Sequence, residues 1–135
     1  MESYRISLRV FHPRCSHVEI IEHIGLDPAH AHSVGLERSS RDGALLGGNY
    51  RETYVSFPLT PKVEGYFVEG LHKILVALQQ KATVLEFLVG SGGRCELSVG
   101  IFSSKNIGFT LTALDMDALS QLKLDVSISA YLEDE

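Results

Sequence analysis

The sequence has few of the features that mark secreted or membrane-spanning proteins. It contains two cysteines in 135 residues, Cys15 and Cys95, and they lack the spacing of a paired motif. Small secreted domains usually need several disulfides, so these cysteines indicate reduced thiols. No apolar run approaches the roughly 20 residues of a spanning helix, and the N-terminus lacks the apolar core of a signal peptide. We therefore expect a cytoplasmic protein with no membrane partner.

Positive charge is also scarce. The chain has 12 Lys+Arg against 17 Asp+Glu, a formal net charge of -5, and its basic residues are scattered. Binding to a phosphate backbone needs a clustered cationic surface, so no nucleic-acid partner is predicted. The length is typical of one domain, and neither a linker nor an internal repeat divides the chain. We expect a single domain over residues 1–135.

Alternation of apolar and polar residues predicts a strand at each end of the chain. Apolar side chains occupy positions 4, 6, 8 and 10 near the start, and positions 124, 126, 128, 130 and 132 near the end. Shorter patterns predict further strands over residues 52–57, 83–89, 95–102 and 107–112. The glycine-rich residues 90–93 are expected to form the turn of a hairpin, because glycine adopts positive φ without strain.

Three helices are predicted from capping residues and helical spacing. Ser16 and Glu19 have the spacing of a capping box that begins a short helix, which should end at Gly25. The long amphipathic segment 62–80 follows Thr60 and Pro61, which suit a helix start. A last short helix should begin at a second capping box formed by residues 112 and 115. Residues 26–49 carry several turn dipeptides and are expected to form an extended loop.

The order of these elements predicts the fold class. Strands and helices follow one another as β-α-β-α-β-β-β-α-β, and the first and last strands alternate cleanly, as in a sheet covered on one face. We therefore expect an α+β two-layer sandwich with a mainly antiparallel sheet and helices on one face. The C-terminal two-thirds should have a ferredoxin-like element order, preceded by an extra N-terminal β-α unit.

The helix-free face of this sheet is the first candidate site. Aromatic, serine and charged side chains should line it, as they line many recognition surfaces, although a polar face is normal for a sheet with one wet side. A homodimer contact and a site for another protein are both open. The binding residues predicted there are Arg5, Arg9, Tyr54, Asp125 and Tyr131.

A histidine and cysteine cluster is the second candidate site. Imidazole and thiolate groups suit zinc, but this cluster matches no known finger spacing, and loop histidines at the surface are the simpler interpretation. Cys15 beside histidines also raises the alternative of a thiol enzyme, although no orienting carboxylate is evident. The candidate metal ligands are His12, Cys15, His17, His30 and His32.

Four stretches of the sequence carry a resemblance to a known family. They are residues 6–10, residues 20–28, residues 54–56, and residues 108–111 with 122–131. Together they resemble the bacterial family called domain of unknown function 4279. The resemblance implies a small cytoplasmic bacterial α+β protein with no established activity, so there is no catalytic residue to transfer. We predict no cofactor. Some small bacterial families of this kind are toxin-immunity proteins, which is an analogy.

The sequence therefore favours one function and leaves one alternative open. The first is a non-enzymatic protein-recognition module of the toxin-immunity type, which binds an unknown protein partner through the polar sheet face and the 26–49 loop. The alternative is a small zinc- or thiol-dependent enzyme that uses the cluster from His12 to His32.

Overall fold

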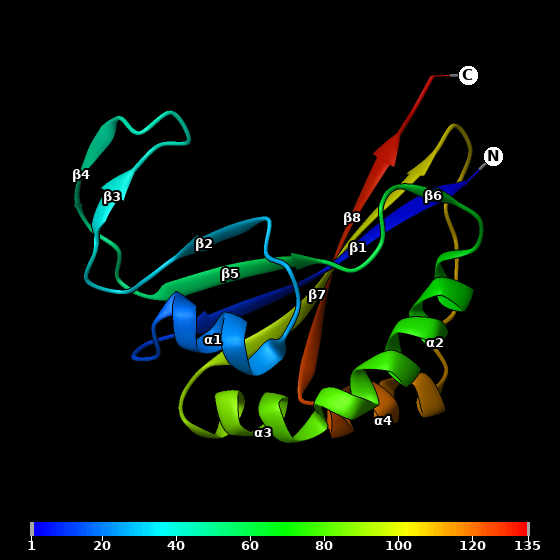
Figure 1. The fold of residues 1–135 in the computed structure, drawn as a ribbon. Helices are drawn as coiled ribbons and strands as arrows, with labels where there is room; N and C mark the ends of the chain where they lie inside the picture. The colour runs from blue at the N-terminus through cyan, green and yellow to red at the C-terminus, as the bar shows by residue number, and fades with distance from the viewer. Residues whose placement is uncertain (1, 135) are drawn as a thin grey trace.

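The computed structural model describes residues 2–134. One layer is a six-stranded sheet in which β2, β5, β1, β7 and β8 lie side by side in that order, while β6 pairs with the start of β1 (Figure 1). Only β7 and β8 run parallel among these pairs. The strands are β1 (Ser3–His12), β2 (His30–His32), β5 (Thr53–Pro58), β6 (Val63–Glu64), β7 (Arg94–Ser103) and β8 (Leu124–Leu132).

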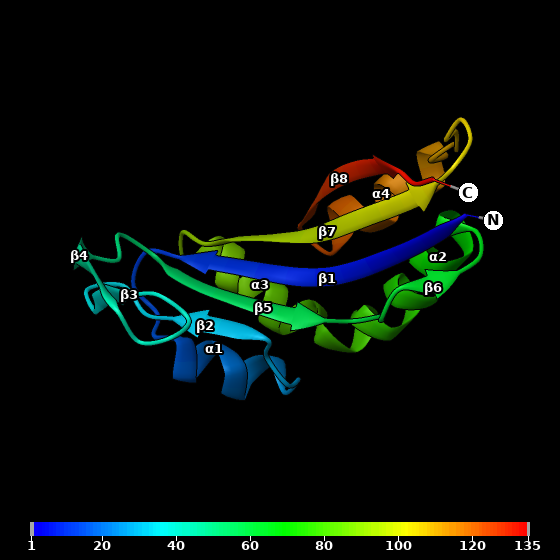
Figure 2. The same cartoon turned by 90° about the horizontal axis from the view of Figure 1, so that it is seen from above.

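The helices form the second layer, on one side of the sheet. Figure 2 looks down on the strands, with α2, α3 and α4 behind them. A separate hairpin of β3 (Glu37–Ser39) and β4 (Leu45–Asn49) rises on the other side (Figure 1). The predicted α+β sandwich with a mainly antiparallel sheet and helices on one face is confirmed. The helices are α1 (His17–Ile24), α2 (Phe67–Leu78), the short 3₁₀ helix η1 (Gln79–Lys81), α3 (Ala82–Gly90) and α4 (Ala113–Gln121).

The core lies between the two layers and follows the predicted alternation. Ile6, Leu8 and Val10 of β1 are fully buried, while the intervening residues point to the opposite face. Both predicted capping boxes are present, at the starts of α1 and α4, and Gly25 ends α1 with a φ of 72°. Among residues 2–134, no helix is long and apolar enough to cross a membrane.

The strand predicted at 83–89 is wrong, because this segment is the helix α3. Leu85 and Leu88 are buried while Glu86 and Phe87 are exposed, which is helical and not alternating spacing. The β-branched residues of this run favour a strand locally, but the turn η1 carries the chain directly from α2 into a second helix. The glycines of 90–93 therefore end a helix. The ferredoxin-like element order was predicted in part from a hairpin of residues 83–89 and 95–102. The structure has no such hairpin, because the helix α3 occupies the first of these two segments.

The strand predicted at 107–112 is also absent. Its alternation is real, since Ile107, Phe109 and Leu111 pack against the core. However, β7 already pairs with β1 on one side and β8 on the other, so no strand edge is free there for this segment. Residues 26–49 were predicted to be a loop, but they contain three strands. One of them, β2, joins the sheet, and the other two form the hairpin β3–β4.

The long helix begins five residues later than predicted, at Phe67. Val63 and Glu64 instead pair with the first residues of β1, so the sheet competes for the segment where the helix was expected to start. Gly70 then lets α2 pack closely on the sheet, because a Cβ at this position would lie 2.3 Å from the hydroxyl of Tyr4. Sheet pairing thus outweighs the local start signal of Thr60 and Pro61.

Candidate functional site

The strand register arranges the helix-free face in transverse rows. Arg9 on β1 lies opposite Ser56 of β5 on one side and Glu96 of β7 on the other. The same row continues to His30 of β2 and Asp125 of β8. Residues that face each other across paired strands point to the same side of a sheet, so this row spans the whole face. Arg9 Nη1 lies 3.7 Å from Glu96 Oε1, so the two side chains form a cross-strand ion pair.

An aromatic and cationic row lies at the β2 end of the face. The rings of His32, Tyr54 and Phe11 follow one another at centroid distances of 5.7 and 5.0 Å. The guanidinium of Arg94 then lies 3.8 Å from the centroid of Phe11, a cation–π contact. Arg94 also pairs with Glu52 at 3.3 Å. We call this row the proximal cluster.

A second aromatic pair lies at the opposite end of the face. Phe102 and Tyr131 stack with ring centroids 5.0 Å apart and an interplanar angle of 14°. Two cations flank Phe102, Lys62 with Nζ at 4.2 Å from the centroid and Arg5 at 5.6 Å. We call this group the distal cluster. Between the two clusters lies a row of small polar groups in which Ser7, Ser98 and Ser127 face one another.

The structure places all the predicted binding residues on this face but distributes them. Tyr54 lies in the proximal cluster and Arg5 and Tyr131 lie at the distal end, while Arg9 and Asp125 lie in the row between them. The prediction missed the cations that complete the two clusters, Arg94 and Lys62. Their signal was weak, because Arg94 follows a glycine turn and Lys62 lay in a segment assigned to a helix.

The predicted metal ligands separate into two groups. His12 and Cys15 lie together at the end of β1, with Sγ 3.6 Å from Nε2. His17, His30 and His32 line a pocket beside β2. The side chains of His30 and His32 do point the same way, because the segment is a strand. Within residues 2–134, no group of three His, Cys, Asp or Glu side chains is placed to hold a metal ion.

The hydrogen bonds of His12 determine its protonation. Nδ1 accepts the backbone N–H groups of Arg14 and Cys15, at 3.0 and 2.9 Å, so this nitrogen carries no proton. Nε2 therefore carries the ring proton and donates it to Ser91 Oγ at 2.8 Å, while Ser91 Oγ donates to the carbonyl of Phe87. His12 is almost fully buried and ties the end of β1 to the end of α3.

This protonation does not suit thiol catalysis. A base for Cys15 would have to accept a proton on Nε2, which is the nitrogen that already carries one. Burial, followed by the charge of Glu19, raises the pKa of Cys15, and burial raises the pKa of Cys95 to about 12. Both thiols are therefore protonated at neutral pH, which is the unreactive form.

Fold and site together define an α+β protein in which helices cover one face of the sheet. The helix-free face carries two clusters of aromatic and cationic side chains. The family model of domain of unknown function 4279 matches residues 2–133, and the chain belongs to this family. Neither the curated proteins nor the solved structures gave a match to the chain.

Proposed function

We propose that the protein is a non-enzymatic recognition module that binds a protein partner through the helix-free face. The observation that carries this proposal is the pair of aromatic and cationic clusters, one at each end of the face. Tyrosine and arginine are enriched among the residues that dominate binding energy at interfaces. A sheet face that only meets water needs polar side chains, but it does not need stacked rings under cations.

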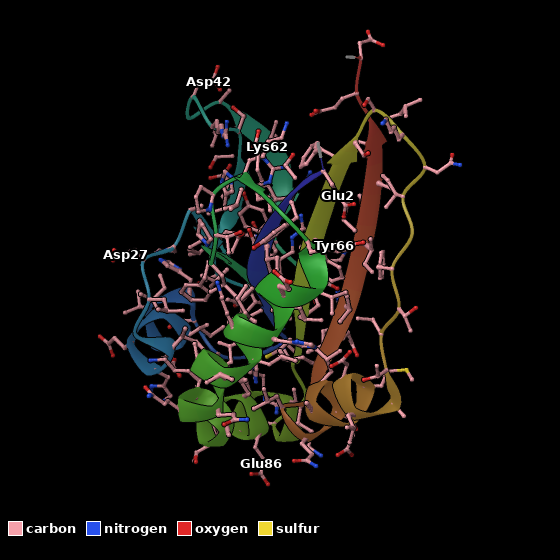
Figure 3. The ribbon with its side chains drawn as sticks, turned by 90° about the vertical axis from the view of Figure 1, so that its right-hand side faces the viewer. Glu2, Asp27, Asp42, Lys62, Tyr66 and Glu86 are labelled. Atoms are coloured by element: carbon pink, nitrogen blue, oxygen red, sulfur yellow. The ribbon has the colours of Figure 1, made fainter. Side chains whose placement is uncertain are left out.

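The hairpin β3–β4 extends this proposed surface. Figure 3 shows Asp42, at the hairpin tip, at the opposite end of the molecule from Glu86 on α3. The hairpin therefore rises on the side away from the helices, next to the proximal cluster. Its strands are exposed along their length, including Leu45 and Leu46 at 68% and 53% exposure. A partner seated on the sheet face would meet these apolar side chains at its edge.

The proposed partner is a protein with an acidic surface, and toxin neutralisation is one such role. Of the face's cations, Arg9, Lys62 and Arg94 already have carboxylate partners, whereas Arg5 has none among the described residues. Arg5 is exposed and lies opposite Gly100, where the stacked rings of Phe102 and Tyr131 fill the space that a side chain would take. A partner carboxylate at Arg5 would thus add an ion pair that the isolated chain does not make.

Affinity capture from the source cell tests this proposal. We expect Arg5→Glu to weaken the complex by about tenfold or more, with a smaller effect as salt rises, because opposite charges across an interface become like charges. Arg9→Glu should do the same, but it also faces Glu96 and should lower stability by up to about 1 kcal/mol. Lys73→Glu, on the exposed side of α2, is the matched control and should bind normally.

Two outcomes would replace the proposal. If Arg5→Glu and wild type recover the same partner equally at low and high salt, this face is not the binding surface. If the protein sediments as a dimer that Tyr131→Glu dissociates, the face binds a second copy instead.

The zinc or thiol enzyme is tested separately. Stoichiometric zinc in protein purified without a histidine tag, lost on His30→Ala or Cys15→Ala, would favour it. Slow reaction of Cys15 with a thiol reagent in the native state, compared with the unfolded chain, is what its raised pKa leads us to expect.

A further inference from the structure

A pocket lies between β2, the N-terminus of α1 and the hairpin β3–β4. Its volume is about 470 Å³, within the usual range of roughly 300 to 1,000 Å³ for small-molecule sites. Imidazole, phenol and guanidinium groups dominate its wall, together with one carboxylate, that of Glu37. The ring and guanidinium side chains are those of His17, His30, His32, Arg41, Tyr50 and Tyr54.

The hydrogen bonds inside the wall leave mainly donors for an occupant. Arg41 Nη2 donates to His30 Nε2 at 3.0 Å, which leaves the other N–H groups of the guanidinium available. Ser33 Oγ engages the Nδ1 of His17 at 2.5 Å, so Nε2 is the nitrogen of that ring left for a ligand. The hydroxyl of Tyr50 already donates to the carbonyl of Ser39.

His32 adds a polar group without a partner. Its Nδ1 is buried and makes no hydrogen bond with the described residues. The ring lies between Tyr50, at a centroid distance of 3.6 Å, and Tyr54, at 5.7 Å. Nδ1 is shielded in this orientation, but a half-turn about the Cβ–Cγ bond exchanges it with a ring carbon and returns the ring to the same plane.

We propose that this pocket binds a small molecule through an oxyanion group, a carboxylate or a phosphate, held by Arg41 and His17. Several N–H donors converge there against one carboxylate, which is the arrangement that oxygen acceptors require. After the half-turn, the N–H of His32 is a further donor to the same anion. The site adjoins the proximal cluster and shares with it the rings of His32 and Tyr54.

The charges around His32 agree with an anion as occupant. Burial, followed by the charge of His17, lowers the pKa of His32, so the ring is neutral at pH 7 and free to donate from one nitrogen. His17 and Arg41 face the ring from α1 and the hairpin, and Glu37 and Glu52 are the nearby acids. An anion in the pocket would favour the protonated form of His32 and so raise the pKa of this ring.

Nuclear magnetic resonance of the imidazole nitrogens tests the site on the intact chain. We expect inorganic phosphate or acetate, titrated at constant ionic strength, to cause saturable shifts of His17 and His32 and to raise the pKa of His32. Arg41→Gln should weaken binding about tenfold or more, because a hydrogen bond to a charged group is lost. Arg38→Gln, on the same hairpin but with its side chain on the carbonyl of Gly47, is the matched control and should bind as wild type does.

The two probes distinguish the sources of the oxyanion. Saturation by phosphate alone assigns the site to phosphorylated ligands, and saturation by acetate alone assigns it to carboxylates. His32→Phe keeps the ring stack and should weaken both. The proposal is overturned if neither probe shifts His17 and His32 up to tens of millimolar. Equal binding by Arg41→Gln and wild type would also overturn it.

Discussion

The two histidine regions of this protein differ in how their hydrogen bonds are used. At the end of β1, both nitrogens of His12 have partners within the chain, and the residue is 1% exposed. Beside β2, Nδ1 of His32 has no partner among the described residues, and a pocket lies against the ring. The first region holds one histidine and the second holds three, all from residues 12–32, so residue type alone does not separate them.

The difference shows which of the two regions is structural. In the region of His12, both ring nitrogens form hydrogen bonds that hold β1 to α3, so neither nitrogen is available to a ligand. In the region of His32, donors remain available to a ligand, and one buried polar atom, Nδ1 of His32, has no hydrogen bond. Substitutions in the first region should therefore lower the free energy of unfolding, whereas substitutions in the second should change binding.

The largest effect is expected from Gly93→Ala. A Cβ there would lie 2.7 Å from Cδ2 of His12 and 2.7 and 2.8 Å from the backbone oxygens of Phe11 and Leu88. Backbone cannot move away as a flexible side chain can, so we expect a loss of about 3 kcal/mol or more in urea unfolding. Gly90→Ala is the control, because its Cβ meets nothing within 4 Å. Equal stability of the two variants would contradict the close packing around His12.

His12→Phe should have the next largest effect. It removes the acceptor of two backbone N–H groups and the donor to Ser91, and unsatisfied donors make the loss about 2 to 4 kcal/mol. His23→Phe, at an exposed position of α1, should change stability by less than about 0.5 kcal/mol. A His12→Phe variant as stable as wild type would show that the network does not support the fold.

The pH dependence of stability should be smaller but specific. Burial, followed by the charge of Arg14, lowers the pKa of His12 below its ordinary value of 6.5. The unfolded state therefore binds a proton before the folded state does, and stability falls as pH drops below 6.5 towards the folded-state pKa. Urea unfolding on both sides of this pH should show the slope, and His12→Phe should reduce it. An unchanged slope in the variant would assign the effect to other groups.

The smallest effect on stability is expected from His32→Phe. The change removes a buried nitrogen that has no partner and keeps a ring between the two tyrosines, so unfolding should shift by no more than about 0.5 kcal/mol. A loss as large as that of His12→Phe would mean that both histidines are structural. The comparison between the two regions would then fail.

The predictions that succeeded are those that depend on near neighbours in the chain. The capping boxes at Ser16 and Thr112 and the left-handed Gly25 are local geometry, and strand alternation identified the buried side of β1. The predictions that failed depended on pairing. Residues 107–112 alternate, but the preceding strand β7 already has a neighbour on each side, and residues 83–89 form the helix α3 instead of pairing with β7.

The candidate face was predictable in part for the same reason. Arg5, Arg9, Tyr54, Asp125 and Tyr131 were expected on one side, and strand periodicity placed them there. Periodicity along a strand does not say which strands lie next to each other, so the stacking of Phe102 on Tyr131 could not be derived. For the same reason, the sequence did not predict that His12 and His32 lie in different regions. That separation follows from the position of β2 beside β5.

The sequence by itself determined the α+β class, the buried side of the long strands and the capped helix starts, because these depend on contacts within a few residues. It also determined the family, through patterns that run over residues 2–133. Only the tertiary structure decided the strand order, the helix at 82–90 and the pocket beside β2. Those features depend on contacts between segments that are distant in the sequence. Hydrogen-bond pairing between two such segments leaves no periodic mark in either one.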